Sequence, residues 1–398
     1  MNAPSVLTAR RRSRRFGLLV LACVLRASTA GAGTLALPLR IVHPDLPLAG
    51  RPNRFDYATI DPQRRLLFIA HLGSGIVTVV DLRDERVVAN IPDVPGVHGV
   101  LAVPALDEVF ATATDRNRLE VISERTFHVV ASAPAGVYPD GMAYAPGAHE
   151  LFISDEAGHT ETVVDTRSNR RIATIAMGGE VGNSQYDPVS RRILVDVQTR
   201  DEIVAIDPRT DTVVRRTRLP DVCNDDHSLL LDAPARLAFV ACDGNARLLL
   251  VDMRDMRVLS VHRTGHDPDV LAFDPGLQRL YVASESGVVT VFHLQGRRLR
   301  LLGRGHLAYE AHSVAVDPRT HRVYFPLQNV DGRGVLRIMA PTSLPATSSH
   351  GLPTESALPR SGTNHGPRHG ERQTRAREND RRPIPRMAMP AHRAPVTS

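Results

Sequence analysis

Short segments rich in Val, Ile and Leu recur along most of the chain, and polar turns separate them. The turns contain Asp-Pro, Gly and Asn, which are residues that end strands and begin tight turns. Between these segments no stretch keeps the apolar period of an amphipathic helix. The pattern therefore predicts an all-β body.

Seven copies of a repeat of about 42 residues account for these segments. We take as the anchor of each copy the residue that begins its first strand, and the anchors are Asp56, His98, Asp140, Gly182, His227, Asp269 and His312. Successive anchors are 42, 42, 42, 45, 42 and 43 residues apart. A Pro stands six residues after six of the seven anchors, where its restricted φ suits the turn that follows the first strand.

A large apolar residue stands twelve residues after every anchor, which indicates a core position repeated in each copy: Phe68, Phe110, Phe152, Leu194, Phe239, Tyr281 and Tyr324. Four strands in about 42 residues is the size of a propeller blade. The blades are expected to start near residues 54, 97, 138, 181, 225, 267 and 310 of a domain that spans residues 35–343.

The last copy has only three strands before the chain becomes polar, whereas residues 37–42 resemble the fourth strands of other copies. We therefore predict a seven-bladed β-propeller of four-stranded antiparallel blades whose ring is closed by an N-terminal strand. Such closure leaves no open sheet edge.

The body resembles the YncE-like bacterial proteins of the YVTN β-propeller group over nearly all of residues 37–340. The resemblance is carried by the segments Arg54-Phe55-Asp56-Tyr57 with Asp61-Pro62, residues 76–81, Pro95-Gly96-Val97-His98-Gly99, and residues 267–284. The tetrapeptide Tyr-Val-Thr-Asn occurs only in altered form, for example as Tyr281-Val282-Ala283-Ser284. The resemblance implies an exported, WD40-like propeller and a binding or surface module, without a defined chemistry.

The N-terminal 30 residues have the pattern of a secretory signal peptide. Five Arg between positions 10 and 15 precede an apolar run at 16–25, and Ser28-Thr29-Ala30 suits signal peptidase. The run is too short to span a membrane, so we expect no transmembrane span in the mature chain, which would be periplasmic or secreted. Arg14-Arg15 loosely resembles a twin-arginine motif, which leaves the export route open, and lipid anchoring through Cys23 is a minor alternative.

Residues 344–398 are rich in Arg, Pro, Ser and Thr without apolar periodicity, and this composition predicts a disordered tail. The net charge of +6 comes from the two ends, because six Arg without acids precede the body and the tail has nine Arg against four acids. About −5 is left for the body, so we expect it to bind no nucleic acid specifically. We expect a monomer.

In a propeller the first strands line the axial channel, so the anchors are expected to meet at one mouth of the channel. Asn183 takes the place of Gly182 there, and the set then offers three imidazoles, three carboxylates and an amide. Three interpretations stay open: a hydrogen-bonded plug, a divalent metal site with His98, His227 and His312 as ligands, and a site for an organic or peptide ligand.

The positions fifteen residues after the anchors lie across from them on the second strand and include His71, Asp155 and Cys242. We expect His71 to join Asp56, His98 and His312 in one cluster. Asp140 and Asp155 are expected to form a second, acidic one.

The mature chain would keep two cysteines, Cys223 and Cys242, and an even pair in an oxidising compartment favours a disulfide. Two free thiols and a Cys/His metal site with His227 are the alternatives. The chain has no Gly-rich phosphate loop, nucleophile elbow, HExxH, CxxC or Trp.

These observations favour a binding or scaffold module that presents the channel mouth to a small molecule, a peptide or an envelope protein. One alternative is a metal-dependent lyase or lactone hydrolase with Asp56, Asp140 or Asp269 as its base. Another is a purely structural envelope protein. A divalent metal ion is the one cofactor that the His and Asp residues suggest.

Overall fold

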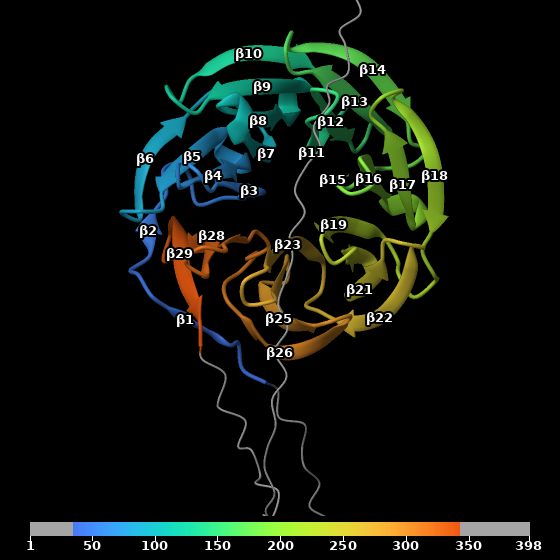
Figure 1. The fold of residues 1–398 in the computed structure, drawn as a ribbon. Helices are drawn as coiled ribbons and strands as arrows, with labels where there is room; N and C mark the ends of the chain where they lie inside the picture. Colours follow the sequence, from blue (N-terminus) through green and yellow to red (C-terminus); the bar gives the residue numbers. More distant parts are fainter. Residues whose placement is uncertain (1–34, 343–398) are drawn as a thin grey trace, which may run out of the picture. The chain divides into compact units, whose positions relative to one another are not determined.

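The structure is a computed structural model that describes residues 35–342. The predicted signal peptide and the predicted disordered tail lie outside the described residues. The described part folds into seven antiparallel sheets arranged as a ring (Figure 1). The innermost strands contact one another in sequence around the ring, and the last, β27, contacts the first, β3. The predicted seven-bladed propeller is confirmed.

Six blades are continuous in the chain, and each runs outward from its innermost strand. The first three contain β3 (Ala58–Asp61), β4 (Leu66–His71), β5 (Ile76–Asp81) and β6 (Arg86–Ile91); β7 (Val97–Val103), β8 (Glu108–Ala113), β9 (Arg118–Ser123) and β10 (Val129–Pro134); and β11 (Pro139–Ala145), β12 (Glu150–Asp155), β13 (Thr160–Asp165) and β14 (Arg170–Ala176). The next three contain β15 (Ser184–Asp187), β16 (Arg192–Val197), β17 (Glu202–Asp207) and β18 (Thr212–Arg218); β19 (Asp226–Asp232), β20 (Leu237–Cys242), β21 (Arg247–Asp252) and β22 (Arg257–Arg263); and β23 (Pro268–Asp274), β24 (Arg279–Ser284), β25 (Val288–Gln295) and β26 (Arg298–His306).

The seventh blade combines both ends of the described chain. It contains β27 (Ala315–Asp317), β28 (Arg322–Val330) and β29 (Arg333–Pro341), and β1 (Leu39–Ile41) forms its outermost strand. Leu39 lies opposite Pro341, and β2 (Leu46–Pro47) also pairs with β29. The predicted closure by an N-terminal strand is confirmed.

The core lies between neighbouring blades. All seven large residues predicted at the repeated core position are buried, six of them with no exposed area. Their spacing follows from the fold, because the same point of each second strand faces the next blade. Each pair of neighbouring blades therefore shares one apolar cluster.

A repeated turn ties neighbouring blades together at the end of the ring opposite the anchors. The residue nine positions after each anchor has a left-handed backbone, and in three blades its side chain reaches a buried Asp of the preceding blade. Arg236 lies 2.6 Å from Asp187, His321 Nδ1 lies 2.8 Å from Asp274, and Arg65 lies 3.0 Å from Asp317.

Two glycines allow the inner strands to approach one another closely. A Cβ on Gly99 would overlap the backbone oxygen of Asp140, and a Cβ on Gly182 would overlap that of His227. Any larger residue at these positions would push apart the strands that line the channel.

Candidate functional site

The anchors lie where the inner strands begin, and in four blades the strand ladder is interrupted there. The register shifts between Val97 and Val100, Pro139 and Met142, Asp226 and Ser228, and Pro268 and Leu271. A bulge re-aims the side chain beside it. These irregularities turn His98, Asp140, His227 and Asp269 toward the axis.

A cavity of about 340 Å³ lies at this mouth of the channel, and we call it the mouth cavity. It draws residues from five blades and contains one Arg, two Tyr and one Leu beside the anchors. Its carboxylates are Asp56, Asp140, Glu156, Asp243, Asp269 and Glu285. Tyr57 lines both this cavity and a second one of about 250 Å³ further along the axis, so the two cavities adjoin at this residue.

His312 is a buried cation behind the cavity wall. Its Nδ1 lies 2.6 Å from Asp269 Oδ2 and its Nε2 lies 3.0 Å from the carbonyl oxygen of Phe55. Both partners only accept hydrogen bonds, so both ring nitrogens donate and the ring is an imidazolium. Burial opposes this charge, but the hydrogen bond and the charge of Asp269 raise the pKa of His312 above its usual value.

His227 contacts the same carboxylate from the other side. Gln198 Nε2 donates to Glu156, which leaves Gln198 Oε1 to accept from His227 Nδ1 at 2.6 Å. His227 Nε2 lies 3.5 Å from Asp269 Oδ1. Burial works against the charged ring, yet the hydrogen bond and charge of Asp269 hold the pKa of His227 well above its usual value. The pKa of Asp269 is lowered despite its burial, because two imidazolium rings donate to it.

Arg54 is the other cation of the mouth cavity. Its Nη1 donates to Glu285 at 2.7 Å, its Nε lies 3.4 Å from Asp56, and its Nη2 lies 3.7 Å from Asp269. One guanidinium thus faces three carboxylates from blades one and six, which is a geometry that suits its fixed fork of donors.

The metal ligands predicted from the sequence do not come together. Among the described residues, one group has ligand atoms close enough to share an ion, namely Asp269, Glu285 and His312, within 4.8 Å of one another. Arg54 already pairs with both of these carboxylates, and neither nitrogen of His312 has a free lone pair. The arrangement fits a guanidinium better than a metal ion.

His98 faces a phenol across the cavity. Its Nδ1 donates to the carbonyl oxygen of Gly96 at 2.8 Å, so its Nε2 is free to accept from the hydroxyl of Tyr138 at 3.0 Å. Burial, followed by the charge of Glu156, raises the pKa of Tyr138 to about 12. The phenol therefore keeps its proton and acts as a donor.

Asp140 has no such partner. Its side chain is only 4% exposed, and its Oδ1 forms no hydrogen bond within the described residues. Burial raises its pKa well above the usual value, and the nearby charges of Asp56 and Glu156 add to the shift. On the blade-three side of the cavity, Asp140 therefore favours its protonated form while the cavity is empty, and its Oδ1 has no donor within the described residues.

Three predicted site residues lie elsewhere. His71 stacks on Phe55 at 4.1 Å, and its Nε2 hydrogen-bonds to Arg51 and Asn53 in the loop before β3. Asp155 accepts from Gly136 in the loop before β11, and from Thr160 and Thr162. His71 and Asp155 therefore do not join the clusters expected for them, because the ends of the second strands face the preceding loops. Asn183 lines the second cavity.

Several cavity residues were not predicted, although the repeat contains a signal for them. Arg54 and Tyr138 both stand two residues before an anchor. Leu72, Glu156, Asp243 and Glu285 all stand sixteen residues after one, immediately beyond the second strand. The cavity is therefore completed by residues two positions before the anchors and by residues immediately beyond the second strands, and not by the positions fifteen residues after the anchors.

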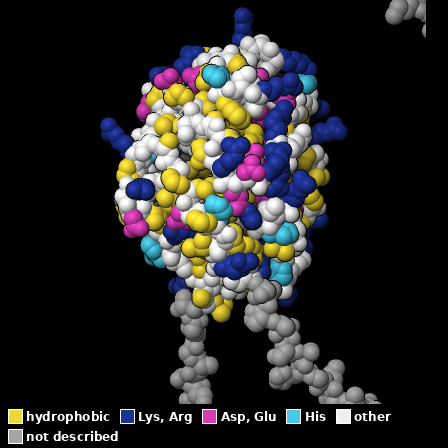
Figure 2. Space-filling view, turned by 90° about the vertical axis from the view of Figure 1, so that its left-hand side faces the viewer, with side chains coloured by type: hydrophobic (Ala, Val, Ile, Leu, Met, Phe, Trp, Pro, Cys, Tyr) yellow, Lys and Arg dark blue, Asp and Glu magenta, His cyan; other side chains and the backbone are white. Residues whose placement is uncertain are grey.

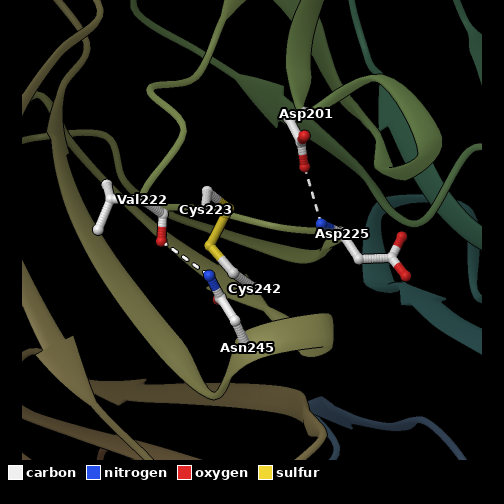
Figure 3. The surroundings of a disulfide bond; sticks show 6 residues. All are labelled: Asp201, Val222, Cys223, Asp225, Cys242 and Asn245. Carbon is white, nitrogen blue, oxygen red and sulfur yellow. Dashed lines mark hydrogen bonds between the residues drawn. A yellow bond between two sulfur atoms is a disulfide. The ribbon is translucent and has the colours of Figure 1, made fainter.

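A disulfide joins Cys223 and Cys242 beside the cavity (Figure 3). It ties the loop before β19 to the end of β20, directly before Asp243, and leaves no thiolate for a metal site with His227. Asn245 Nδ2 donates to Val222 at 2.9 Å and Asp201 accepts from the backbone of Asp225 at 2.7 Å, which fixes the same loop.

One outer face of the ring carries side chains of both charges. Figure 2 shows Arg side chains interspersed with acidic and hydrophobic ones on the side that Figure 1 draws at left, around β6 and β2. No helix among residues 35–342 is long and apolar enough to cross a membrane.

Comparison with known proteins supports the fold and the resemblance. No family model matches the chain. The protein YncE of Salmonella typhi and its counterpart in Salmonella typhimurium, both uncharacterized, are 27% identical over 105 residues, which is 26% of this chain. The match spans only 30% of each relative. Together with the seven blades, this weak homology is consistent with a YncE-like propeller family, as the sequence predicted.

Three solved structures share the fold at low identity. They are the hydrazine synthase of Kuenenia stuttgartiensis (TM-score 0.62, 14% identity, 73% of this chain and 96% of that one), the WD40 repeats of RRP9 (0.63, 12%, 77% and 99%) and U3-55K (0.62, 12%, 77% and 100%). The chain is thus WD40-like in fold.

Proposed function

We propose that this protein is an exported binding module whose mouth cavity holds a small polar ligand. The observation that carries the proposal is the cavity of about 340 Å³ in which polar side chains from five blades converge. Ligand sites are typically concave, largely preformed and provided with a few convergent polar groups. The volume of the cavity limits the ligand to a small molecule or the end of a larger one.

A metal-dependent lyase or hydrolase is less well supported by the same geometry. Such an enzyme needs free imidazole lone pairs, whereas both nitrogens of His312 donate and His98 Nε2 accepts from Tyr138. Asp269, one of the expected bases, lies between two imidazolium rings that lower its pKa.

A purely structural plug accounts for part of the hydrogen bonding but not for all of it. A plug would satisfy its own polar groups and fill the channel. Asp140 Oδ1 and the hydroxyl of Tyr57 have no partner within the described residues, and open space lies in front of Asp140.

A thermal-shift screen of small polar metabolites tests the proposal. Leu72 lines the cavity, so Leu72→Trp should fill it and abolish the stabilisation by any true ligand. Val189→Trp is the matched control, because Val189 is 61% exposed in the turn between β15 and β16, at the far end of the strands. Ligands that stabilise the Leu72→Trp variant as well as the wild type would show that the mouth cavity is not the site.

Export is the second part of the proposal. The Arg-rich start, the apolar run at 16–25 and the disulfide between Cys223 and Cys242 support it. N-terminal sequencing of the chain recovered from the periplasm or the medium should find cleavage near residue 30. Recovery of the uncleaved chain from the cytoplasm alone would contradict export, and loss of export in Arg14→Lys/Arg15→Lys would identify the twin-arginine route.

A further inference from the structure

We infer that the ligand of the mouth cavity is a small organic cation whose ammonium group binds beside Asp140. This inference rests on the proposed function and names its ligand class. It follows from the charge of the cavity, from one buried carboxylate without a partner and from the aromatic rings beside it.

The cavity has more acids than its cations neutralise. Six carboxylates line it, while the positive charges are those of Arg54 and His227 in the wall and of His312 directly behind it. The acids therefore outnumber the cations even when Asp140 is protonated, and an ammonium group beside Asp140 would favour its ionised form. A low-dielectric concavity focuses such a field and attracts a ligand of opposite charge.

The surplus lies on one side of the cavity. Arg54 contacts Asp56, Asp269 and Glu285, and the two imidazolium rings contact Asp269. The cations therefore pair with carboxylates of blades six and one. On blade three, Glu156 receives only the amide of Gln198, and Oδ1 of Asp140 receives nothing. A buried carboxylate oxygen without a partner is costly, and an ammonium group at hydrogen-bond distance would satisfy it.

The groups around Asp140 suit an organic cation. Tyr57 and Tyr138 line the cavity, and the face of an aromatic ring attracts a cationic nitrogen. Leu72 adds an apolar surface for the carbon skeleton. A metal ion would instead need several ligand atoms together, and the described group that has them, Asp269 with Glu285 and His312, already faces Arg54.

Isothermal titration calorimetry with three four-carbon compounds separates charge from size. The probes are 1,4-diaminobutane, 1,4-butanediol and succinate, which have similar lengths but carry positive, no and negative charge at pH 7.5. We expect 1,4-diaminobutane to bind, and the diol and succinate to bind at least about tenfold more weakly. Absence of diamine binding, or tighter binding of either other probe, would overturn the inference.

Asp140→Asn keeps the shape of the side chain and removes its charge, so it should weaken diamine binding at least about tenfold. Glu156→Gln provides a second variant with the same expected direction. Asp84→Asn is the control, because Asp84 lies in the exposed turn between β5 and β6 at the other end of the strands. Circular dichroism verifies that each variant is folded. Unchanged affinity in both Asp140→Asn and Glu156→Gln would contradict the assignment.

Calcium and zinc chloride form the metal arm of the titration. Metal binding that is tighter than diamine binding and is lost in Asp140→Asn would refute the organic cation while leaving a binding site in the mouth cavity. Binding of the diol or succinate that Leu72→Trp abolishes would have the same meaning. Failure of the proposed function would give a different result from failure of this inference, because ligands would then bind the Leu72→Trp variant with the same affinity as the wild type.

Discussion

Three buried carboxyl groups in blades three to five predict that the protein is more stable at pH 6 than at pH 8. Glu161 in β13, Asp196 in β16 and Asp226 in β19 have no exposed area. Both side-chain oxygens of Asp226, and one each of Glu161 and Asp196, lack a hydrogen-bond partner within the described residues.

Burial raises the pKa of both Glu161 and Asp196 to about 8. The pKa of Asp226 rises to about 10, first through burial and then through the charge of Asp196. In an unfolded chain the same groups titrate at about pH 4. Between pH 5 and pH 8 the folded state therefore binds more protons than the unfolded state. Each group's contribution to stability is complete below its unfolded pKa and is lost as the pH rises toward its folded pKa.

The magnitude for one group is about 1.4 kcal/mol of unfolding free energy per pH unit. Asp226→Asn removes one titrating group without changing the size of the side chain. Between pH 6 and pH 8 the variant should therefore lose about 3 kcal/mol less stability than the wild type. The quantity to compare is the change of unfolding free energy with pH and not its absolute value, because the new amide also lacks hydrogen-bond partners and lowers the stability at every pH.

Urea unfolding at pH 6, 7 and 8 measures this difference, with far-ultraviolet circular dichroism as the probe because the chain has no Trp. Asp221→Asn is the matched control, since the side chain of Asp221 is 98% exposed, and it should keep the wild-type slope. Equal slopes in Asp226→Asn and the wild type, or wild-type stability that rises between pH 6 and pH 8, would refute the reasoning.

Three further substitutions test how the ring is held together. Leu39→Ala in the closing strand should lower the free energy of urea unfolding by about 2 kcal/mol, because Leu39 packs between blades six and seven. No loss of stability would mean that β1 contributes little to ring closure. Arg236→Met should cost about 3 kcal/mol at pH 7 by leaving Asp187 buried without its cation, and Asp187→Asn in the same chain should recover part of that loss. Replacing both cysteines by Ser opens a link between residues 19 apart and should cost about 3 kcal/mol, and an unchanged melting temperature would contradict a structural role.

The fold was predictable because its signal repeats. Seven copies average out local ambiguity, so the core position occupied by Phe68 in the first blade could be identified by spacing alone. The closing strand was predictable for a related reason. A blade with three strands needs a fourth, and residues 37–42 had the right pattern.

The site was only partly predictable, because direction is a property of the backbone and not of spacing. His98, Asp140, His227 and Asp269 face the axis since bulges at the starts of their strands turn them there. His71 and Asp155 have the same residue types but satisfy loop groups instead. The role of Arg54 as the partner of three acids depends on blades one and six, which lie on either side of blade seven and come near each other only when the ring closes.

The geometry does not favour His98, His227 and His312 as metal ligands, for a reason that composition does not show. An imidazole binds metal through a lone pair, and whether that lone pair is free depends on its neighbours. The carbonyl of Phe55 and the carboxylate of Asp269 accept hydrogen bonds from the two ring nitrogens of His312. Neither nitrogen then has a free lone pair, and the ring is a cation instead of a metal ligand.

A crystal structure of the protein with a ligand from the thermal-shift screen tests the central claim most directly. The account predicts electron density in the mouth cavity, in contact with Asp140 and next to the ring of Tyr138, and none there in crystals of the Leu72→Trp variant. Density for the ligand only on the outer strands or in the second cavity, with the mouth cavity unchanged, would contradict it.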